Sequence, residues 1–344
     1  MGAGDSESVP SALPNILERL ETGASVLVLR LRSLGDAVLT TPALELLRRA
    51  RPDLEVWAAL DEPLAELYQD HPALAGVIPM RRGDLPAMVR SARAVRPRLC
   101  LNFHGGSSSA WTALLSGARW RAGFGHYRRG FVYNVKIPRA QEILGRPSNA
   151  PVHTAEHLAS AVFHLGAPVA EIPRASLAAG PPPFRGSYAV LHIAAAYETK
   201  RWDEGRFLSV ARHVEYRHGL EPVFLAGPGE DHLLAAFPKH RRMYGLGAAE
   251  LKSLLAGARL FVGNDSGPAH VAAAFGVPSA VIFGSSNSAV WRPWKTPHEV
   301  IETSWDCKPC PGDRCYAFDQ PRCILSVSVE AVVAAVDRLL ALDR

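Results

Sequence analysis

At 344 residues the chain is longer than one hydrophobic core usually serves, so its length favours two domains of ordinary size. Hydrophobic residues make up 48% of the chain and charged residues 21%, which excludes wholesale disorder and fibrous repeats. The net charge of +5 favours an anionic partner, such as a nucleotide, a phosphorylated glycolipid, a membrane surface or nucleic acid, and does not choose among them.

The distribution of apolar residues along the chain and the composition of residues 1–7 predict a cytoplasmic protein. No apolar run approaches the roughly 18 residues that a membrane-spanning helix needs, and the acidic residues 1–7 lack the basic and apolar regions of a signal peptide. Residues 1–24 mix Pro, Ser, Glu and Gly and are predicted to form an N-terminal extension, in which only 16–20 has the composition of a short helix.

The core is predicted to begin with a strand, a turn and a helix. Residues 26–31 are a short apolar run typical of a buried parallel strand, and a helical pattern follows from 39 to 50. Pro42 conflicts with one continuous helix, because an interior proline removes a hydrogen bond and clashes with the preceding turn. Thr41 as N-cap with Pro42 in the first helical position, or a kink at Pro42, would resolve the conflict.

Further apolar runs alternate with helical segments, which predicts βαβ units and parallel sheets. In the first half, strands are predicted at 55–60, 76–78 and 99–101, and helices at 85–95 and 109–116. In the second half, strands are predicted at 188–193, 222–225, 260–262 and 279–283, and helices at 203–218, 251–256, 268–275 and 327–342. Residues 166–186, rich in Ala, Pro and Gly, are predicted to link two doubly wound α/β lobes whose ligands bind in the cleft between them.

Residues 30–36, Arg-Leu-Arg-Ser-Leu-Gly-Asp, form the first segment that carries chemistry. Transfer of a group to a hydroxyl needs a base within hydrogen-bond reach of that hydroxyl, and Asp36 at the end of a strand can supply it. The alternative is that Asp36 is an N-cap, because Asp is among the preferred N-cap residues. The local pattern alone favours the cap.

The second segment, residues 261–274, predicts a strand, a small-residue turn and a helix in immediate succession. Pro268 fits the first helical turn, and the free N–H groups and positive dipole end of such a helix bind pyrophosphate well. Asp265 would repel phosphates unless its carboxylate turns toward a hydroxyl or a backbone donor, and capping is its alternative role. His270 lies early in the helix, where a single histidine is more often a core residue than a catalyst.

The third segment is the turn after strand 188–193, where Lys200 and Arg201 are followed by Trp202. Adjacent cations can neutralise the charge that develops on a departing nucleoside diphosphate, which a metal ion would otherwise do. A solvated surface pair is the alternative, and Trp202 favours an ordered loop. The sequence contains no Asp-x-Asp arrangement that would hold a divalent ion against a diphosphate, so a metal-free mechanism is favoured.

Cysteines gather near the C-terminus. Cys100 stands alone in an apolar run and is predicted to be a small buried hydrophobe, whereas Cys307, Cys310, Cys315 and Cys323 are separated by gaps of two, four and seven residues. Their density suggests a structural zinc ion, and a cytosolic location disfavours disulfides. Because the gaps match no standard zinc pattern, four reduced thiols are the alternative.

Together these segments resemble glycosyltransferase family 9, whose best-known members are the lipopolysaccharide heptosyltransferases. The resemblance extends from about residue 26 to residue 340 and rests on the order and spacing of segments 30–44, 102–105, 114–118, 123–124, 196–202, 263–270, 278–284 and the C-terminal cysteines. It implies a GT-B fold, in which two Rossmann-like lobes face a cleft. Residues 25–175 would form the acceptor-binding lobe, 187–325 the nucleotide-sugar-binding lobe and 326–344 a C-terminal helix.

The resemblance implies an inverting, metal-independent enzyme that moves a heptose from ADP-heptose to a lipopolysaccharide inner-core acceptor, with no cofactor in catalysis. It makes Asp36 the base that deprotonates the acceptor hydroxyl and Lys200 the cation that stabilises the leaving group. Glu230 would contact the ribose, and Thr199 and Lys200 the diphosphate. The residues that it assigns to the donor are Thr199, Lys200, Glu230, Asp265, Ser266, Gly267 and His270.

The acceptor is implied to be an anionic glycolipid, which places the enzyme in the cytoplasm with peripheral contact at the inner membrane surface. His104, Arg128 and Arg129 are the candidate acceptor contacts, although the Arg pair fits a plain surface equally well. Asn102 stands where many relatives carry Asp, and the serines at 107–109 replace a stretch that often includes a basic residue. No nucleic-acid partner is expected, because the sequence has no aromatic and basic platform.

Three other functions remain open at this stage. A family-9 transferase could use another nucleotide-sugar or another surface-glycan acceptor. A GT-B-type nucleotide-sugar epimerase would convert the donor without any acceptor. A non-catalytic carbohydrate-binding protein would retain the fold without the chemistry.

Overall fold

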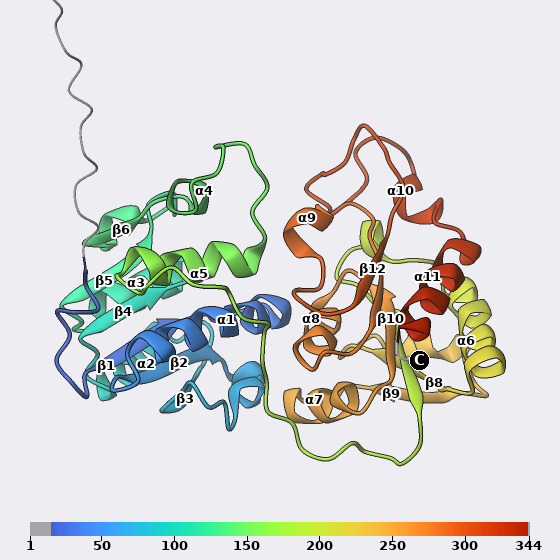
Figure 1. Ribbon diagram of the computed structural model, residues 1–344, viewed down its shortest axis with the longest axis horizontal. Coiled ribbons are helices and arrows are strands. Elements are labelled where there is room, and N and C mark those ends of the chain that lie inside the picture. Colours follow the sequence, from blue (N-terminus) through green and yellow to red (C-terminus); the bar gives the residue numbers. More distant parts are fainter. Residues whose placement is uncertain (1–14, 343–344) are drawn as a thin grey trace, which may run out of the picture.

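The computed structural model describes residues 15–342, which form two lobes, each built on a six-stranded parallel sheet flanked by helices (Figure 1). The strand order is β3-β2-β1-β4-β5-β6 in the first lobe and β12-β11-β10-β7-β8-β9 in the second. Both lobes therefore have the Rossmann order, in which the chain reverses direction across the sheet between two central strands. The predicted doubly wound α/β class is confirmed.

In the first lobe the strands are β1 (Ser25–Leu29), β2 (Glu55–Asp61), β3 (Gly76–Met80), β4 (Leu99–Asn102), β5 (Trp120–Phe124) and β6 (Val135–Ile137). The helices are α1 (Leu34–Ala50), α2 (Leu85–Ala94), α3 (Ser107–Leu115), α4 (Ala140–Ile143) and α5 (Thr154–His164), with 3-10 turns η1 (Glu62–Tyr68) and η2 (Gly130–Val132).

In the second lobe the strands are β7 (Tyr188–His192), β8 (Glu221–Ala226), β9 (Arg241–Tyr244), β10 (Leu260–Asn264), β11 (Ser279–Ile282) and β12 (His298–Ile301). The helices are α6 (Glu204–His218), α7 (Ala248–Ala256), α8 (Gly267–Ala274), α9 (Ser288–Trp291), α10 (Arg322–Leu325) and α11 (Val329–Ala341), with 3-10 turns η3 (Glu198–Lys200) and η4 (Asp231–Ala236).

Helix α1 is continuous through Pro42, so the predicted start of a helix at Thr41 and Pro42 is wrong. The helix begins eight residues before Pro42, so Thr41 is not its N-cap. Pro42 cannot donate to the carbonyl of Val38, and the Thr41 hydroxyl donates to that oxygen instead, at 2.8 Å. A side-chain hydrogen bond thus replaces the missing backbone one.

The segment before β1 is a run of turns and not the short helix predicted at 16–20. Ile16, Leu17 and Leu20 are buried in the apolar core of the first lobe, and the backbone N–H of Leu17 donates to the carbonyl of Leu165 at 3.0 Å. Three apolar side chains within five residues therefore reflect packing against the lobe, not helical periodicity. The rest of the predicted extension, residues 1–14, lies outside the described residues.

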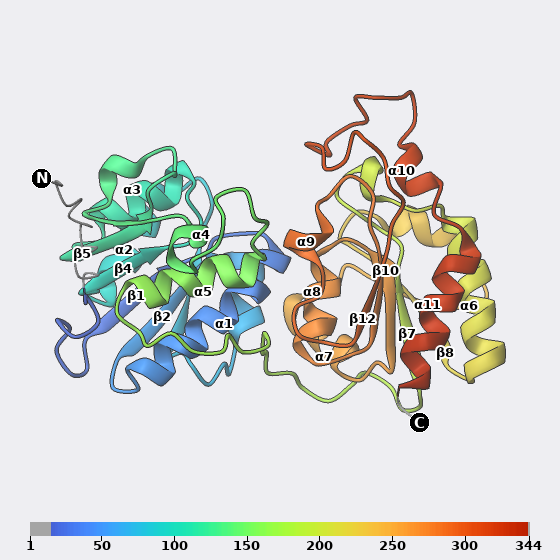
Figure 2. The same cartoon turned by 45° about the horizontal axis from the view of Figure 1, so that its top comes forward.

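The predicted linker has no regular structure from residue 167 to residue 186 and runs between the two lobes (Figure 2). It is held along its length, because Ser176 donates to the Thr41 hydroxyl at 3.0 Å and Pro173 accepts from the Trp294 indole at 2.8 Å. The C-terminal helix α11 packs against α6 and β12 of the second lobe. Within residues 15–342, no helix is both long and apolar enough to cross a membrane.

Candidate active site

A cleft of about 910 Å³ lies between the lobes at the carboxyl ends of their central strands. The segment after β1 supplies Ser33, Leu34, Gly35 and Asp36, and the opposite wall comes from the segments after β7, β8 and β10. The cleft therefore joins the topological switch points of the two sheets, where open α/β folds bind their ligands.

The N-terminal ends of helices α1 and α8 meet across this cleft. A Cβ atom at Gly35 of α1 would lie 2.6 Å from Cδ2 of His270, and one at Gly267 of α8 would lie 2.8 Å from Cδ2 of Leu34. Each glycine thus permits a close approach of the other lobe. Because helix N-termini carry free N–H groups and a partial positive charge, this junction suits an anionic ligand.

Asp36 occupies the third position of α1, and Ser33 is the N-cap, so the interpretation of Asp36 as the N-cap is wrong. One carboxylate oxygen forms an ion pair with Arg30, and the other accepts from the backbone N–H and the hydroxyl of Ser33, at 3.3 and 2.9 Å. The side chain remains 21% exposed on the cleft. Contact with an opposite charge favours the ionised carboxylate, as a base requires.

Arg30 was part of the predicted segment but not of the predicted site. Its side chain is almost fully buried, pairs with Asp36 and donates to the carbonyl of Phe103. Burial lowers the pKa of Arg30, while the neighbouring Tyr127 and Tyr68 raise it. Because a guanidinium stays protonated in proteins, Arg30 fixes a positive charge behind the Asp36 carboxylate.

Lys200 and Asp265 line the second-lobe wall as an ion pair, with 2.9 Å between Nζ and Oδ2. The same Asp265 oxygen accepts from the Ser286 hydroxyl at 2.5 Å. Asp265 is therefore turned toward a cation and a hydroxyl, and the cation offsets its negative charge near the N-terminus of α8. It also fixes the position of the Lys200 ammonium.

Two buried histidines lie beside the turn between β10 and α8, and both line the cleft. The Ser266 hydroxyl lies 3.0 Å from Nδ1 of His192, and His270 packs edge to face with Trp291. Burial lowers the pKa of both His192 and His270 to about 4. Both rings are therefore neutral near pH 7 and add no charge to the cleft.

Of the two remaining residues predicted to bind the donor, Glu230 lines the cleft and Thr199 does not. Glu230 lines the cleft, and its Oε2 accepts from the backbone N–H of Gly227 at 3.0 Å. The Thr199 side chain is buried away from the cleft, where its hydroxyl donates to the carbonyl of Gly312 and accepts from Ser285 at 3.0 Å. The Thr199 hydroxyl is therefore not directed into the cleft, where its contact with a diphosphate was predicted.

The predicted acceptor residues lie outside the lining of the cleft. His104 is partly buried, and burial lowers its pKa. Arg129 donates to Ser107 at 3.1 Å and lies over the Trp111 ring, whereas Arg128 is exposed. Arg129 therefore contacts Ser107, one of the serines at 107–109. None of His104, Arg128 and Arg129 lines the cleft.

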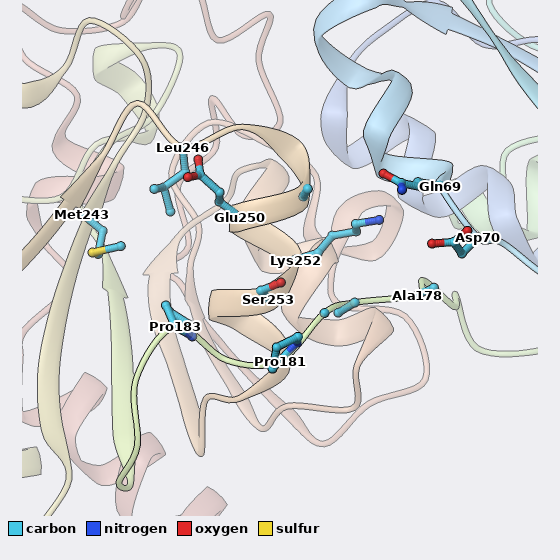
Figure 3. Close-up of a pocket in the computed structure, with 13 residues that line it drawn as sticks. Gln69, Asp70, Ala178, Pro181, Pro183, Met243, Leu246, Glu250, Lys252 and Ser253 are labelled. Carbon is cyan, nitrogen blue, oxygen red and sulfur yellow. The ribbon is translucent and has the colours of Figure 1, made fainter.

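A second cavity, of about 550 Å³, lies between α7 and the linker and contains none of the predicted site residues (Figure 3). The Lys252 side chain extends from α7 toward the segment that carries Gln69 and Asp70 (Figure 3). Its Nζ donates to the carbonyls of Glu66 and Leu67, at 2.7 and 3.3 Å. These bonds tie the lobes together, so this cavity belongs to the interlobe contact.

The predicted zinc ligands Cys307, Cys310, Cys315 and Cys323 do not converge. Among residues 15–342, three or more ligand atoms of His, Cys, Asp or Glu come within bonding range of one ion only at a group in α6 and α11, described below. Burial raises the pKa of the Cys323 thiol, which disfavours the thiolate that zinc would need. The zinc prediction thus gains no geometric support.

The two facing Rossmann-like lobes and the cleft between them define an α/β enzyme of the GT-B type. Residues 87–317 match the model of glycosyltransferase family 9 (heptosyltransferase), and the chain belongs to this family and is a glycosyltransferase. The predicted family and enzyme class are confirmed.

Known relatives align with this chain over most of its length. It is 26% identical to lipopolysaccharide heptosyltransferase 3 of Escherichia coli, over 89% of this chain and 96% of that protein, and 25% identical to lipopolysaccharide heptosyltransferase 1 of Pseudomonas aeruginosa, over 92% and 98%. The solved structure of the E. coli ADP-heptose lipopolysaccharide heptosyltransferase II superimposes with a TM-score of 0.76 at 18% identity, covering 93% of this chain and 99% of that one. The predicted GT-B fold is confirmed.

Proposed function

We propose that this glycosyltransferase moves a heptose from ADP-heptose to an acceptor in the lipopolysaccharide inner core, with inversion and without a metal ion. The observation that carries the proposal is that Asp36 and Lys200 line one cleft from opposite lobes. A base and a cation can then act on opposite sides of one transferred sugar. The names of the relatives support the sugar and the acceptor.

In the proposed reaction, the Asp36 carboxylate takes the proton of the acceptor hydroxyl. The acceptor oxygen attacks the anomeric carbon while the bond from that carbon to the diphosphate oxygen breaks, so a single displacement inverts the configuration. Arg30 keeps the carboxylate charged, and the two hydrogen bonds from Ser33 orient it. A carboxylate has about four lone-pair sites, so these bonds leave one for the acceptor.

On the other side of the sugar, charge develops on the departing ADP. Lys200 would stabilise this charge together with the N-terminal N–H groups of α8 at Ser266 and Gly267. Asp265 would hold Lys200 in place, His270 would complete the turn, and Glu230 would contact the ribose. Thr199 would contribute to the diphosphate site through its backbone, since its hydroxyl is engaged elsewhere.

The lobes are proposed to divide the substrates between them. Residues 25–175 would take the anionic glycolipid, with His104, Arg128 and Arg129 as contacts outside the cleft, and residues 187–325 would take the nucleotide-sugar. Because the acceptor is a membrane lipid, the enzyme would work in the cytoplasm, in peripheral contact with the inner face of the cytoplasmic membrane.

Incubation of the full chain with ADP-heptose and truncated inner-core glycolipids, followed by mass spectrometry, tests the proposal. We expect a heptosylated product with ADP-heptose and not with UDP- or GDP-sugars, and unchanged rates in EDTA. Asp36→Asn should lower kcat by at least about 100-fold while donor affinity stays within a few-fold, because the base and its ion pair with Arg30 are lost on the acceptor side of the cleft.

Four results would contradict parts of this proposal. Full activity of Asp36→Asn would exclude the base, and a preference for UDP- or GDP-sugars would exclude the donor. Conversion of the donor without any acceptor would indicate an epimerase. Donor binding without turnover on any acceptor would favour a carbohydrate-binding protein.

A further inference from the structure

A cluster of two histidines and one aspartate joins two helices of the second lobe, outside the cleft. Nε2 of His213 lies 2.7 Å from Oδ1 of Asp337, and Nε2 of His218 lies 2.6 Å from the same oxygen. The histidines belong to α6 and the aspartate to the C-terminal helix α11, which lie side by side in both views (Figures 1 and 2). None of the three residues lines the cleft.

We propose that this cluster binds a divalent transition-metal ion such as Zn²⁺, Ni²⁺ or Co²⁺ through the two Nε2 atoms and Oδ1. Imidazole nitrogens suit these ions, whereas Mg²⁺ and Ca²⁺ prefer sites made of oxygen alone. The ion would join the C-terminal helix to α6.

The three ligand atoms lie within 4.8 Å of one another, which is the range of one coordination sphere. Tetrahedral zinc with bonds of 2.0–2.1 Å separates its ligand atoms by about 3.3 Å, so each histidine must withdraw from the carboxylate by about 0.6 Å. The side chains can move this far, because His213, His218 and Asp337 are 26%, 13% and 44% exposed. The exposure of Asp337 also leaves room for water as a further ligand.

Metal binding requires each imidazole to present the lone pair of its Nε2 atom. In the structure both Nε2 atoms face the carboxylate, and a shift of each neutral ring to the Nδ1–H tautomer frees the Nε2 lone pair for the ion.

The cation that follows Asp337 in the chain is paired with a carboxylate of another element. The cation next to Asp337 in the sequence is Arg338, which forms an ion pair with Glu299 at 2.9 Å. Its charge is thereby balanced by a residue of β12. The net charge of the cluster with neutral imidazoles is negative, which favours a cation.

The test uses the full chain without a histidine tag, freed of metal and titrated with Co²⁺, Ni²⁺ and Zn²⁺ in a calorimeter. We expect one equivalent of metal to bind and to raise the midpoint of thermal unfolding. His213→Gln and Asp337→Asn should each weaken the affinity by at least about tenfold. His232→Gln, at an exposed histidine of the same lobe, and Cys310→Ser should leave it unchanged.

The visible spectrum with Co²⁺ provides a second measurement that does not depend on the variants. Nitrogen and oxygen ligands give only weak d–d bands, whereas cysteine thiolates add an intense charge-transfer band. Absence of binding, an intense thiolate band, or an affinity that Cys310→Ser lowers and His213→Gln does not, would overturn the proposal. Donor binding and transfer should be unaffected by His213→Gln, so failure of this proposal is distinct from failure of the proposed transferase function.

Discussion

A neighbouring carboxylate fixes the position of the Lys200 ammonium group. The Asp265 carboxylate holds its Nζ at 2.9 Å, and the Ser286 hydroxyl holds Asp265 in turn. Lys200→Gln should lower kcat on the order of 100-fold, because the departing diphosphate loses a fixed cation. Steady-state kinetics with ADP-heptose check this, with the exposed Lys239→Gln as the control. Equal kcat values in the two variants would exclude Lys200 from the leaving-group site.

Gly35 lies where the N-terminus of α1 packs closely against α8 of the other lobe. Gly35→Ala would place a methyl group 2.6 Å from the buried His270 ring, so the N-terminus of α1 must withdraw from α8. We expect kcat/KM to fall by at least about tenfold, since displacements of the order of 1 Å are costly in an active site. The matched control is Gly125→Ala, where the nearest atom would lie 3.6 Å away. If both variants retained full activity, close apposition of the two helices would be irrelevant to catalysis.

Family resemblance, and not the local pattern alone, identified the cleft residues that could be predicted from the sequence. Asp36, Lys200, Glu230 and the 265–270 turn all line the cleft, as expected of segments that follow parallel strands. The partners that fix them could not be predicted: Arg30 is buried against Phe103, and Ser286 arrives from the segment after β11. Such pairings depend on distant segments meeting. The same reason explains Thr199, whose hydroxyl is satisfied by Gly312.

At the scale of one element, helix α1 depends on the pair Thr41 and Pro42. The Thr41 hydroxyl donates to the carbonyl of Val38 and accepts from the N–H of Ser176, so it completes the helix and anchors the linker. Thr41→Val removes both bonds with little change of volume. We expect a loss of about 1–3 kcal/mol in the free energy of unfolding, because buried polar groups are left unpaired.

A double-mutant cycle separates these two effects. Pro42→Ala restores the backbone N–H that can donate to Val38, so Thr41→Val should cost less in that background. Urea unfolding of the parent chain, the two single variants and the double variant gives the coupling free energy between Thr41 and Pro42. Identical costs in both backgrounds would show that the hydroxyl does not compensate for the proline.

Continuous apolar runs decided which strands could be predicted. Central strands such as β1, β7 and β10 are continuous apolar runs and were predicted. The strands β5, β6, β9 and β12 and the helix α5 were not predicted. Polar residues interrupt the apolar pattern of these strands, as in Trp-Arg-Ala-Gly-Phe of β5 and Arg-Arg-Met-Tyr of β9. A strand whose outer groups remain in water carries little hydrophobic signal.

At the scale of the whole molecule, the two lobes share one apolar cluster. It extends from residues of β1 and α1 to residues of α7 and α8, so the interface between the lobes is part of the core. Lys252 adds a polar connection from α7 to η1. Periodicity predicted the two lobes but not their contact, since a helical pattern reports one buried face and not its partner.

Buried histidines in both lobes predict how the whole molecule responds to acid. Burial lowers the pKa of His153, His157, His192 and His270 to about 4, from the ordinary value of 6.5. Between these values the unfolded chain binds more protons than the folded one. Stability is therefore fully present above about pH 6.5 and declines as the pH falls toward 4, by up to about 1.4 kcal/mol per pH unit for each group.

Urea unfolding at pH 7.5, 6.0 and 5.0 measures this decline. His157 offers the sharpest variant, because its ring stacks on Phe124 with 3.9 Å between centroids and has no ion pair to lose among the residues described. His157→Phe preserves the stacking and removes the titration, so its stability should depend less steeply on pH than that of the parent chain. The exposed His232→Gln should keep the parent slope. A parent stability that is constant from pH 7.5 to 5.0 would contradict the prediction, because neutral histidines cannot remain buried at no cost while the unfolded chain takes up protons.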